Sequence, residues 1–80
     1  MRVSLNGPLR AGAGGLAEVE VEAETIGELL TRLVDRFPAM QDALDRGIAV
    51  AVDREIYRDD WTQPIPEGAE VVLLPRIEGG

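Results

Sequence analysis

The sequence predicts an α+β fold in which a mixed sheet of four to five strands packs against one main helix. Three observations indicate this. One stretch, residues 26–37, carries an apolar stripe with helical spacing. Short runs of alternating or β-branched residues precede and follow that stretch. The chain has 80 residues, which suffices for one helix-on-sheet core and is too short for a separate cofactor domain.

Two strands are expected before the helix. Residues 1–5 place Val3 and Leu5 on one face. Residues 18–24 alternate glutamate with small or branched apolar residues, which predicts one buried and one solvated face. The connecting stretch, residues 6–15, is rich in glycine and is expected to be a loop that closes a hairpin.

The main helix is expected to begin after Thr25, whose hydroxyl group is a good N-cap, with Glu28 completing a capping box. Pro38 ends this helix, and residues 39–46 are expected to form a second, short one that ends at Gly47. The apolar stripe of the main helix comprises Ile26, Leu29, Leu30, Leu33, Val34 and Phe37.

Three further strands are expected. Residues 48–52 form an interior strand, residues 56–57 a short one after a turn, and residues 70–74 the last long one. The first and last strands are expected to lie side by side and parallel at the centre of the sheet. This order is that of the β-grasp, or ubiquitin-like, fold. The expected core comprises Val3, Leu5, Val19, Val21, Leu29, Leu30, Leu33, Phe37, Val50, Val52, Val71 and Leu73.

The other face of the last strand is expected to be open. If Val71 and Leu73 face the helix, Val72 and Leu74 face a side that no second helix layer covers. Together with Ile56, these two residues would form an apolar patch where a partner docks.

The composition limits the possible functions. A net charge of -7 argues against nucleic acids and anionic membranes and favours a partner with a basic face. The sequence has no cysteine and no histidine, so thiolate chemistry and a histidine base are excluded, and no metal site is expected. Without an apolar run of membrane-spanning length, a cytoplasmic location is expected.

Two weak cofactor motifs do not change this. Residues 12–17 match a dinucleotide fingerprint, but they lie between two strands and no helix follows to face a pyrophosphate. The pair Asp59-Asp60 lacks further Mg²⁺ ligands. We therefore expect no bound cofactor and no enzymatic activity of the chain by itself.

The C-terminal end is the most informative segment. We expect a folded domain over residues 1–75 and a flexible tail over residues 76–80, which ends in Gly79-Gly80. Two glycines add no buried side chain and carry a high entropy cost, so they do not serve stability. Five extended residues reach about 15–18 Å, enough to carry the Gly80 carboxylate into a partner's active site.

This end resembles the MoaD/ThiS family of sulfur carriers. Residues 68–80, together with residues 51–53 and Pro64, are similar to the family pattern, and the Leu74-Pro75 step is nearest to the small subunit of molybdopterin synthase. The chain departs from the pattern at Asn6, Ala69, Leu73, Leu74 and Arg76, none of which alters the Gly-Gly end.

The resemblance implies a mechanism. An adenylating enzyme would use ATP to make a glycyl-adenylate at Gly80, and a sulfurtransferase would then supply the sulfur of a C-terminal 1-thioglycine, a thiocarboxylate. The large catalytic subunit of molybdopterin synthase would accept this sulfur, with the chain as its small subunit or co-substrate. In this scheme Arg76, Ile77, Glu78 and Gly79 thread the tail into the partner, and Ile56, Val72 and Leu74 dock the body.

Other functions stay open. The sulfur could serve thiamine, cysteine or a specialised metabolite instead. The chain could be a non-covalent β-grasp interaction module, in which case deletion of Gly79-Gly80 would leave its function intact. A third alternative is a ubiquitin-like modifier that is conjugated through Gly80 to lysines.

Overall fold

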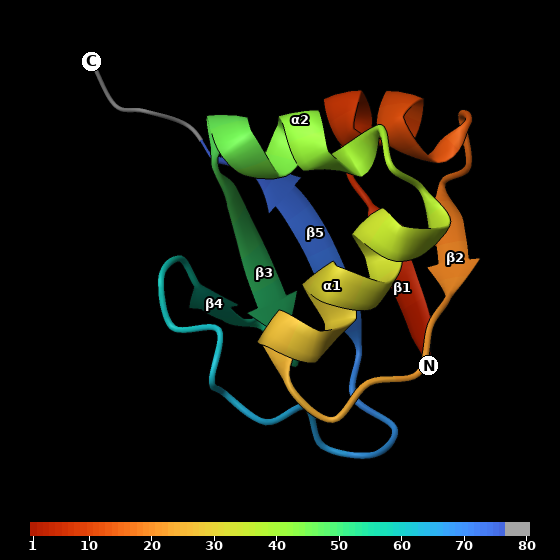
Figure 1. Ribbon diagram of the computed structural model, residues 1–80. Coiled ribbons are helices and arrows are strands. Elements are labelled where there is room, and N and C mark those ends of the chain that lie inside the picture. Colours follow the sequence, from red (N-terminus) through yellow and green to blue (C-terminus); the bar gives the residue numbers. More distant parts are fainter. Residues whose placement is uncertain (77–80) are drawn as a thin grey trace.

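The structure, a computed structural model, describes residues 1–76 (Figure 1). Ile77, Glu78, Gly79 and Gly80 lie outside the described residues. The elements are, in order, β1 (Arg2–Leu5), the 3₁₀ helix η1 (Gly7–Ala13), β2 (Glu18–Glu20), α1 (Ile26–Arg36), α2 (Met40–Arg46), β3 (Ile48–Val52), β4 (Glu55–Tyr57) and β5 (Val71–Pro75).

The sheet has five strands in the order β2-β1-β5-β3-β4. β5 lies at the centre, parallel to β1 and antiparallel to β3, and the outer pairs are antiparallel. The predicted β-grasp arrangement, with the first and last strands paired in parallel, is confirmed. Because β1 and β5 run in the same direction, the start of the chain and the exit of β5 lie at opposite ends of the sheet (Figure 1).

The main helix begins as its sequence predicts. The Thr25 hydroxyl accepts a hydrogen bond from the Glu28 amide at 3.1 Å. The Glu28 carboxylate accepts in turn from the Glu24 amide at 3.0 Å, one residue before the cap. The apolar stripe of α1 then packs on the sheet, with Ile26, Leu29 and Leu33 fully buried.

The connection between β1 and β2 was expected to be a loop because it is rich in glycine. Most of it instead forms the 3₁₀ helix η1. Pro8 fits the first turn of a helix, and Leu9 and Ala13 are buried against the core. Gly12 serves close packing: a Cβ built on it would lie 2.6 Å from the Met40 sulfur of α2. The first glycine of the dinucleotide-like motif thus belongs to a helix–helix contact, whereas Gly14 and Gly15 have open space around them.

Two further expectations were wrong in detail. The second strand pairs only over Glu18–Glu20, because beyond the Arg2–Glu20 pair only the Met1 carbonyl remains to accept the Val21 amide. Phe37 is only partly buried, since it caps the end of α1 at the rim of the core, where the Arg36 guanidinium lies 5.2 Å from its ring centroid. All other predicted core residues are buried.

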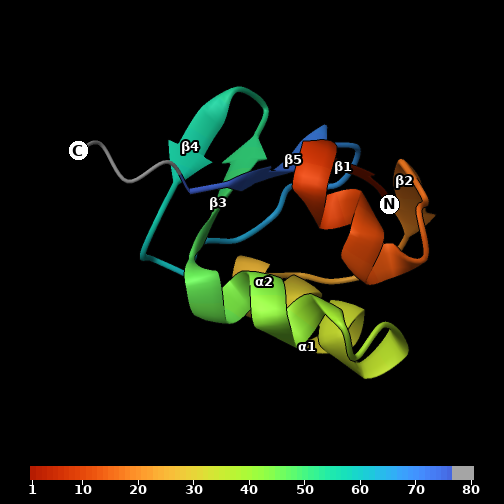
Figure 2. The same cartoon turned by 90° about the horizontal axis from the view of Figure 1, so that it is seen from above.

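The helices lie on one face of the sheet (Figure 2). α1 and α2 cover that face, η1 packs against α2 and β5, and no helix of the described chain covers the opposite face (Figure 2). In residues 1–76, no helix has the length and apolar character needed to cross a membrane.

Candidate functional site

β5 gives the site its geometry. Along this strand the side chains alternate, with Val71 and Leu73 buried beneath the helices and Val72 and Leu74 half-buried on the opposite face. The strand then ends at Pro75, where residues 76–80 begin. One short strand therefore contributes to the core, to an open face and to the exit of the C-terminal segment.

On the open face, a row of residues that pair from strand to strand crosses all five strands. Val72 of β5 pairs with Ala51 of β3, which in turn pairs with Ile56 of β4. In the other direction Val72 pairs with Ser4 of β1, which pairs with Glu18 of β2. Directly paired residues point to the same face. The row is therefore apolar from β5 to β4 and becomes polar toward β2.

We call Val72, Leu74, Ala49, Ala51 and Ile56 the open-face patch; Ile56 is exposed, Val72, Leu74 and Ala51 are half-buried, and Ala49 is buried. Leu74 pairs with Ala49, one step nearer the exit of β5. Ile56 is 54% exposed, and the only other large apolar residue exposed to this degree in the described chain is Leu16, on the connection to β2. An exposed apolar patch beside a chain exit is typical of a docking surface.

Arg76 is fixed at the root of the C-terminal segment by Gly47. Its amide donates a hydrogen bond to the Gly47 carbonyl at 3.1 Å. Its stem packs on the same glycine, where a Cβ would lie 3.2 Å from the Arg76 Cδ. The guanidinium points outward, 4.0 Å from the Asp59 carboxylate. The contact between Arg76 and Gly47 therefore fixes the point at which the chain leaves the sheet.

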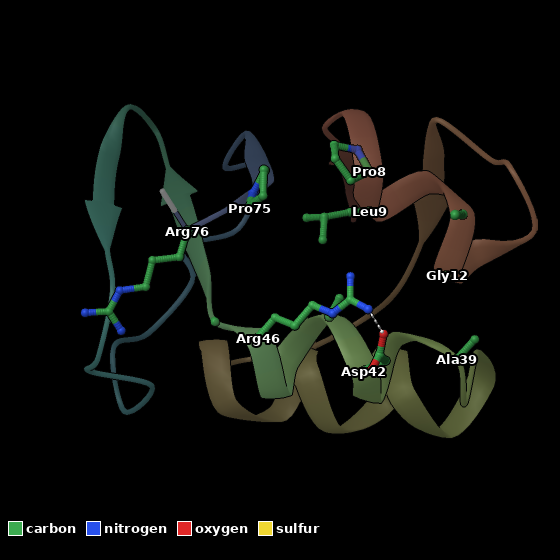
Figure 3. A pocket seen from close by; sticks show the side chains of 11 residues that line it. Pro8, Leu9, Gly12, Ala39, Asp42, Arg46, Pro75 and Arg76 are labelled. Carbon is green, nitrogen blue, oxygen red and sulfur yellow. Dashed lines mark ion pairs between the residues drawn. The ribbon is translucent and has the colours of Figure 1, made fainter. Parts of the chain in front are cut away.

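A groove of about 530 Å³ lies beside this root, between η1 and α2 (Figure 3). Pro8 and Leu9 form one wall, and α2 forms the other. Arg46 extends from α2 into the space and pairs with Asp42 at 3.0 Å, whereas Arg76 points away (Figure 3). The groove is therefore mainly apolar, with one guanidinium at its edge.

The two neighbouring aspartates have roles within their loop. Asp60 accepts hydrogen bonds from the Thr62 hydroxyl and amide groups and from the Gln63 amide group, and these bonds lower the pKa of Asp60. Asp59 faces Arg76. In the described chain, no three acidic side chains gather into a group that could hold a metal ion.

The structure places all three predicted docking residues, Ile56, Val72 and Leu74, on one face. It places Arg76 at the exit, whereas the other predicted tail residues lie outside the described residues. Sequence reasoning missed Gly47 and Asp59 as contacts of Arg76 and the two alanines of the patch. The alternation of large and small residues in Ile48–Val52 was a signal for these alanines.

Comparison with known proteins now bears on this site. The sequence matches the ThiS family over residues 3–80, a match that includes the final glycine pair. The chain belongs to the ThiS family. This is a family of ubiquitin-like sulfur carriers, whose members are small carriers or subunits that act with partner enzymes. A comparison with curated proteins gave no match.

Several solved structures share the fold. The CysO protein of Amycolatopsis orientalis, solved in a complex with BexX, is 25% identical, with a TM-score of 0.79 and coverage of 99% of this chain and 98% of that one. SAMP1 from Haloferax volcanii is 26% identical, with a TM-score of 0.72 and coverage of 99% and 97%. A complex of subunits 1 and 2 of the Helicobacter pylori molybdopterin-converting factor contains a chain that is 22% identical, with a TM-score of 0.68 and coverage of 99% and 96%.

Proposed function

We propose that this ThiS-family protein carries sulfur as a thiocarboxylate on Gly80. The observation that carries this proposal is the family match, which continues through residue 80 and so includes the Gly79-Gly80 end. The fold supports it, because β5 leads the chain out of the sheet at Arg76, beside an apolar patch. The protein thus acts as a co-substrate of partner enzymes and binds no cofactor of its own.

The chemistry begins with a poor electrophile. A Gly80 carboxylate oxygen attacks the α-phosphate of ATP in an adenylating enzyme, pyrophosphate leaves, and the carboxyl group becomes a mixed anhydride with AMP. The persulfide of a sulfurtransferase then attacks the carbonyl carbon and AMP leaves; a thiol reductant cleaves the S–S bond of the acyl disulfide that forms, which releases the thiocarboxylate. Glycine suits both steps because a residue without a Cβ passes a narrow channel and leaves its carbonyl unhindered.

The body and the tail have separate tasks in this proposal. The open-face patch docks on a partner surface by burying Ile56, Val72 and Leu74. The Gly47–Arg76 hydrogen bond fixes where the tail starts. Ile77, Glu78 and Gly79 then span the distance into the partner's active site, since five residues reach about 15–18 Å.

The acceptor that we propose is the large subunit of molybdopterin synthase, which the Leu74-Pro75 step favours. A second candidate is an acceptor in another pathway, such as thiamine, cysteine or a specialised metabolite. This candidate is supported by the similarity to the CysO protein that was solved in a complex with BexX, at 25% identity, rather than with a molybdopterin-converting factor subunit.

Intact-mass measurement tests the carrier chemistry. The protein is incubated with ATP, a sulfurtransferase with its sulfur source and the adenylating enzyme encoded in the same genome. We expect a mass gain equal to the exchange of one oxygen for one sulfur, and no gain in a variant that lacks Gly80. An unchanged mass with an adenylating enzyme that is active on its other substrates would refute the proposal and favour a non-covalent module.

The acceptor is identified in a second step. The thiocarboxylate form is offered separately to the molybdopterin synthase large subunit and to other sulfur-accepting enzymes of the same genome. Loss of sulfur from the protein to only one of them, measured by its return to the unmodified mass, names the acceptor.

A further inference from the structure

The sequence supplies its positive charge without side-chain amines. All eight cationic side chains are arginines, and the 80 residues contain no lysine, cysteine or histidine. An arginine guanidinium stays protonated at neutral pH and is therefore a poor nucleophile. The only primary amine in these 80 residues is the α-amine of Met1.

This composition bears on the proposed function, on which the inference rests. An activated Gly80 carbonyl reacts with free amines: a C–N bond forms, the bond to AMP or to sulfur breaks, and the amine proton passes to solvent. A second copy of the chain is the acceptor that the carrier meets most often in its own solution. A lysine on that copy would divert the acyl group into a covalent dimer.

The one available amine is held as an ammonium ion. The Met1 nitrogen lies 2.6 Å from a Glu22 carboxylate oxygen and 3.3 Å from one of Glu20. The hydrogen bond that this amine donates to Glu22 is the main cause of its raised pKa, and Glu20 adds to the effect. An ammonium ion has no lone pair with which to attack a carbonyl, so these two carboxylates lower the reactivity of the amine.

Other charges near Met1 act in the same direction. Glu24 and Glu67 line a hollow beside the nitrogen, and Glu70 lines a second one. Three cations are also near: Arg2 pairs with Glu18 and Glu20, at 3.4 and 3.9 Å, and Arg32 and Arg36 donate hydrogen bonds to the Glu22 and Glu20 backbone carbonyls. Carboxylates therefore outnumber guanidinium groups around the ammonium ion.

The fold also separates the amine from the chain's own C-terminus. Val3 of β1 pairs with Val71 of β5, so Pro75 lies four residues beyond this pair and Met1 two residues before it. Six residues of strand span about 20 Å. The five residues after Pro75 reach only about 15–18 Å and would have to reverse direction. An attack within one molecule is therefore out of reach.

The cationic residues near the exit of β5 are also arginines. Arg76 forms the root of the tail, and Arg46 lies in the adjoining groove (Figure 3). Arg54 and Arg58 flank β4, next to the open-face patch, and both are exposed. A lysine at any of these positions would be presented where carriers and their partners meet.

We propose that this protein is built as a donor only: its surface offers no amine that an activated copy can acylate, so it neither cross-links to itself nor forms chains. All of its cationic side chains are arginines, and Glu20 and Glu22 hold the α-amine of Met1. If Gly80 is joined to an amine in cells, that amine belongs to another protein.

A chemically made C-terminal aryl thioester tests this without any adenylating or sulfur-transferring enzyme, so a failure of the proposed function would not affect the result. The thioester is incubated at high concentration near pH 7.5, and covalent dimers are counted by intact mass. Hydroxylamine in a parallel sample confirms that the carbonyl is reactive. We expect fewer dimers from the natural sequence than from Arg54→Lys, because the lysine amine would project into solvent, whereas the Met1 nitrogen is held by two carboxylates and the Met1 side chain is only 11% exposed.

The protection of Met1 is tested on the same protein with an acetylating N-hydroxysuccinimide ester at pH 7. We expect one slow acetylation in the natural sequence and a severalfold faster one in Glu20→Gln/Glu22→Gln. Dimers of the natural sequence at the rate of Arg54→Lys, or equal acetylation rates with and without the two glutamates, would overturn the proposal.

Discussion

Replacing Ile56 and Val72 by threonine should separate docking from folding. Both side chains lie on the open face and flank Ala51, so neither substitution opens a cavity beneath the helices. Threonine keeps the β-branched shape that suits a strand, and its hydroxyl group remains solvated in the free protein. We expect the free energy of unfolding to change by no more than about 0.5 kcal/mol for each substitution.

The expected loss of binding free energy is larger than the change in the free energy of unfolding, because a partner would bury the side-chain surface that the free protein leaves exposed. Complete burial of an isoleucine or valine side chain contributes about 1.5–3 kcal/mol. Ile56 is 54% exposed, so roughly half of that contribution, about 1 kcal/mol, remains to be gained on docking. Val72 is half-buried and should contribute somewhat less. A loss of about 1 kcal/mol corresponds to about fivefold in Kd, and both changes together to about 10–30-fold.

The assay is titration calorimetry with the adenylating enzyme, alongside the KM for the carrier in ATP–pyrophosphate exchange. Leu16→Thr is the matched control, because Leu16 is 48% exposed but lies on the connection before β2, away from the patch. Leu73→Ala, on the buried side of the same strand, should instead cost about 2–5 kcal/mol of stability. If the double variant bound like the natural protein, or if Leu16→Thr weakened binding equally, the open face would not be the docking surface.

Three further predictions concern the body of the domain. Gly12→Ala should cost about 1–3 kcal/mol in urea denaturation, since the new Cβ would lie 2.6 Å from the sulfur and 3.3 Å from the Cα of Met40. Gly47→Ala should cost about 1–3 kcal/mol because φ is +102° there. It should also speed hydrogen exchange at the Arg76 amide, whose acceptor is the Gly47 carbonyl; unchanged exchange would contradict the anchoring role. The N-terminal ammonium has a raised pKa and Glu22 a lowered one. Their pairing should therefore stabilise the fold between about pH 4.5 and 8, fading as pH rises through the folded pKa of the amine or falls through that of the carboxylate. Glu22→Gln should reduce stability at pH 6.5 and have little effect at pH 3 or well above the pKa of the amine; an equal effect at all three would rule this pairing out as the cause.

The sequence predicted the sheet and the main helix because their signals are local. The alternation around Val19, the capping residues of α1 and the apolar run of β3 each depend on near neighbours in the chain. The 3₁₀ helix η1 was missed because its stability comes from distant contacts. Leu9 and Ala13 are buried in the core, and Gly12 is needed only because α2 passes close by.

The residues of the candidate site likewise include some that local patterns predict and some that depend on contacts between distant segments. The outward orientation of Val72 and Leu74 follows from the two-residue period of a strand and was predictable. The contact between Gly47 and Arg76 joins residues that are far apart in the sequence, and no local pattern predicts it. Pairing between strands, which sets Ala51 between Ile56 and Val72, could be expected only as a consequence of the whole topology.

The parallel pairing of β1 with β5 is what connects these features. A C-terminal strand at the edge of the sheet would expose unpaired backbone groups and would have a neighbouring strand on one side only. At the centre, β5 is held by hydrogen bonds on both sides, so the exit at Pro75 is fixed while the residues beyond it can reach into a partner. Its outward side chains then lie in the middle of the open face, where a partner that binds this face is also within reach of the tail. The same parallel direction places Met1 at the far end of the sheet. This one topology thus places the proposed docking surface next to the end that we propose is activated, and it keeps the Met1 amine away from that end.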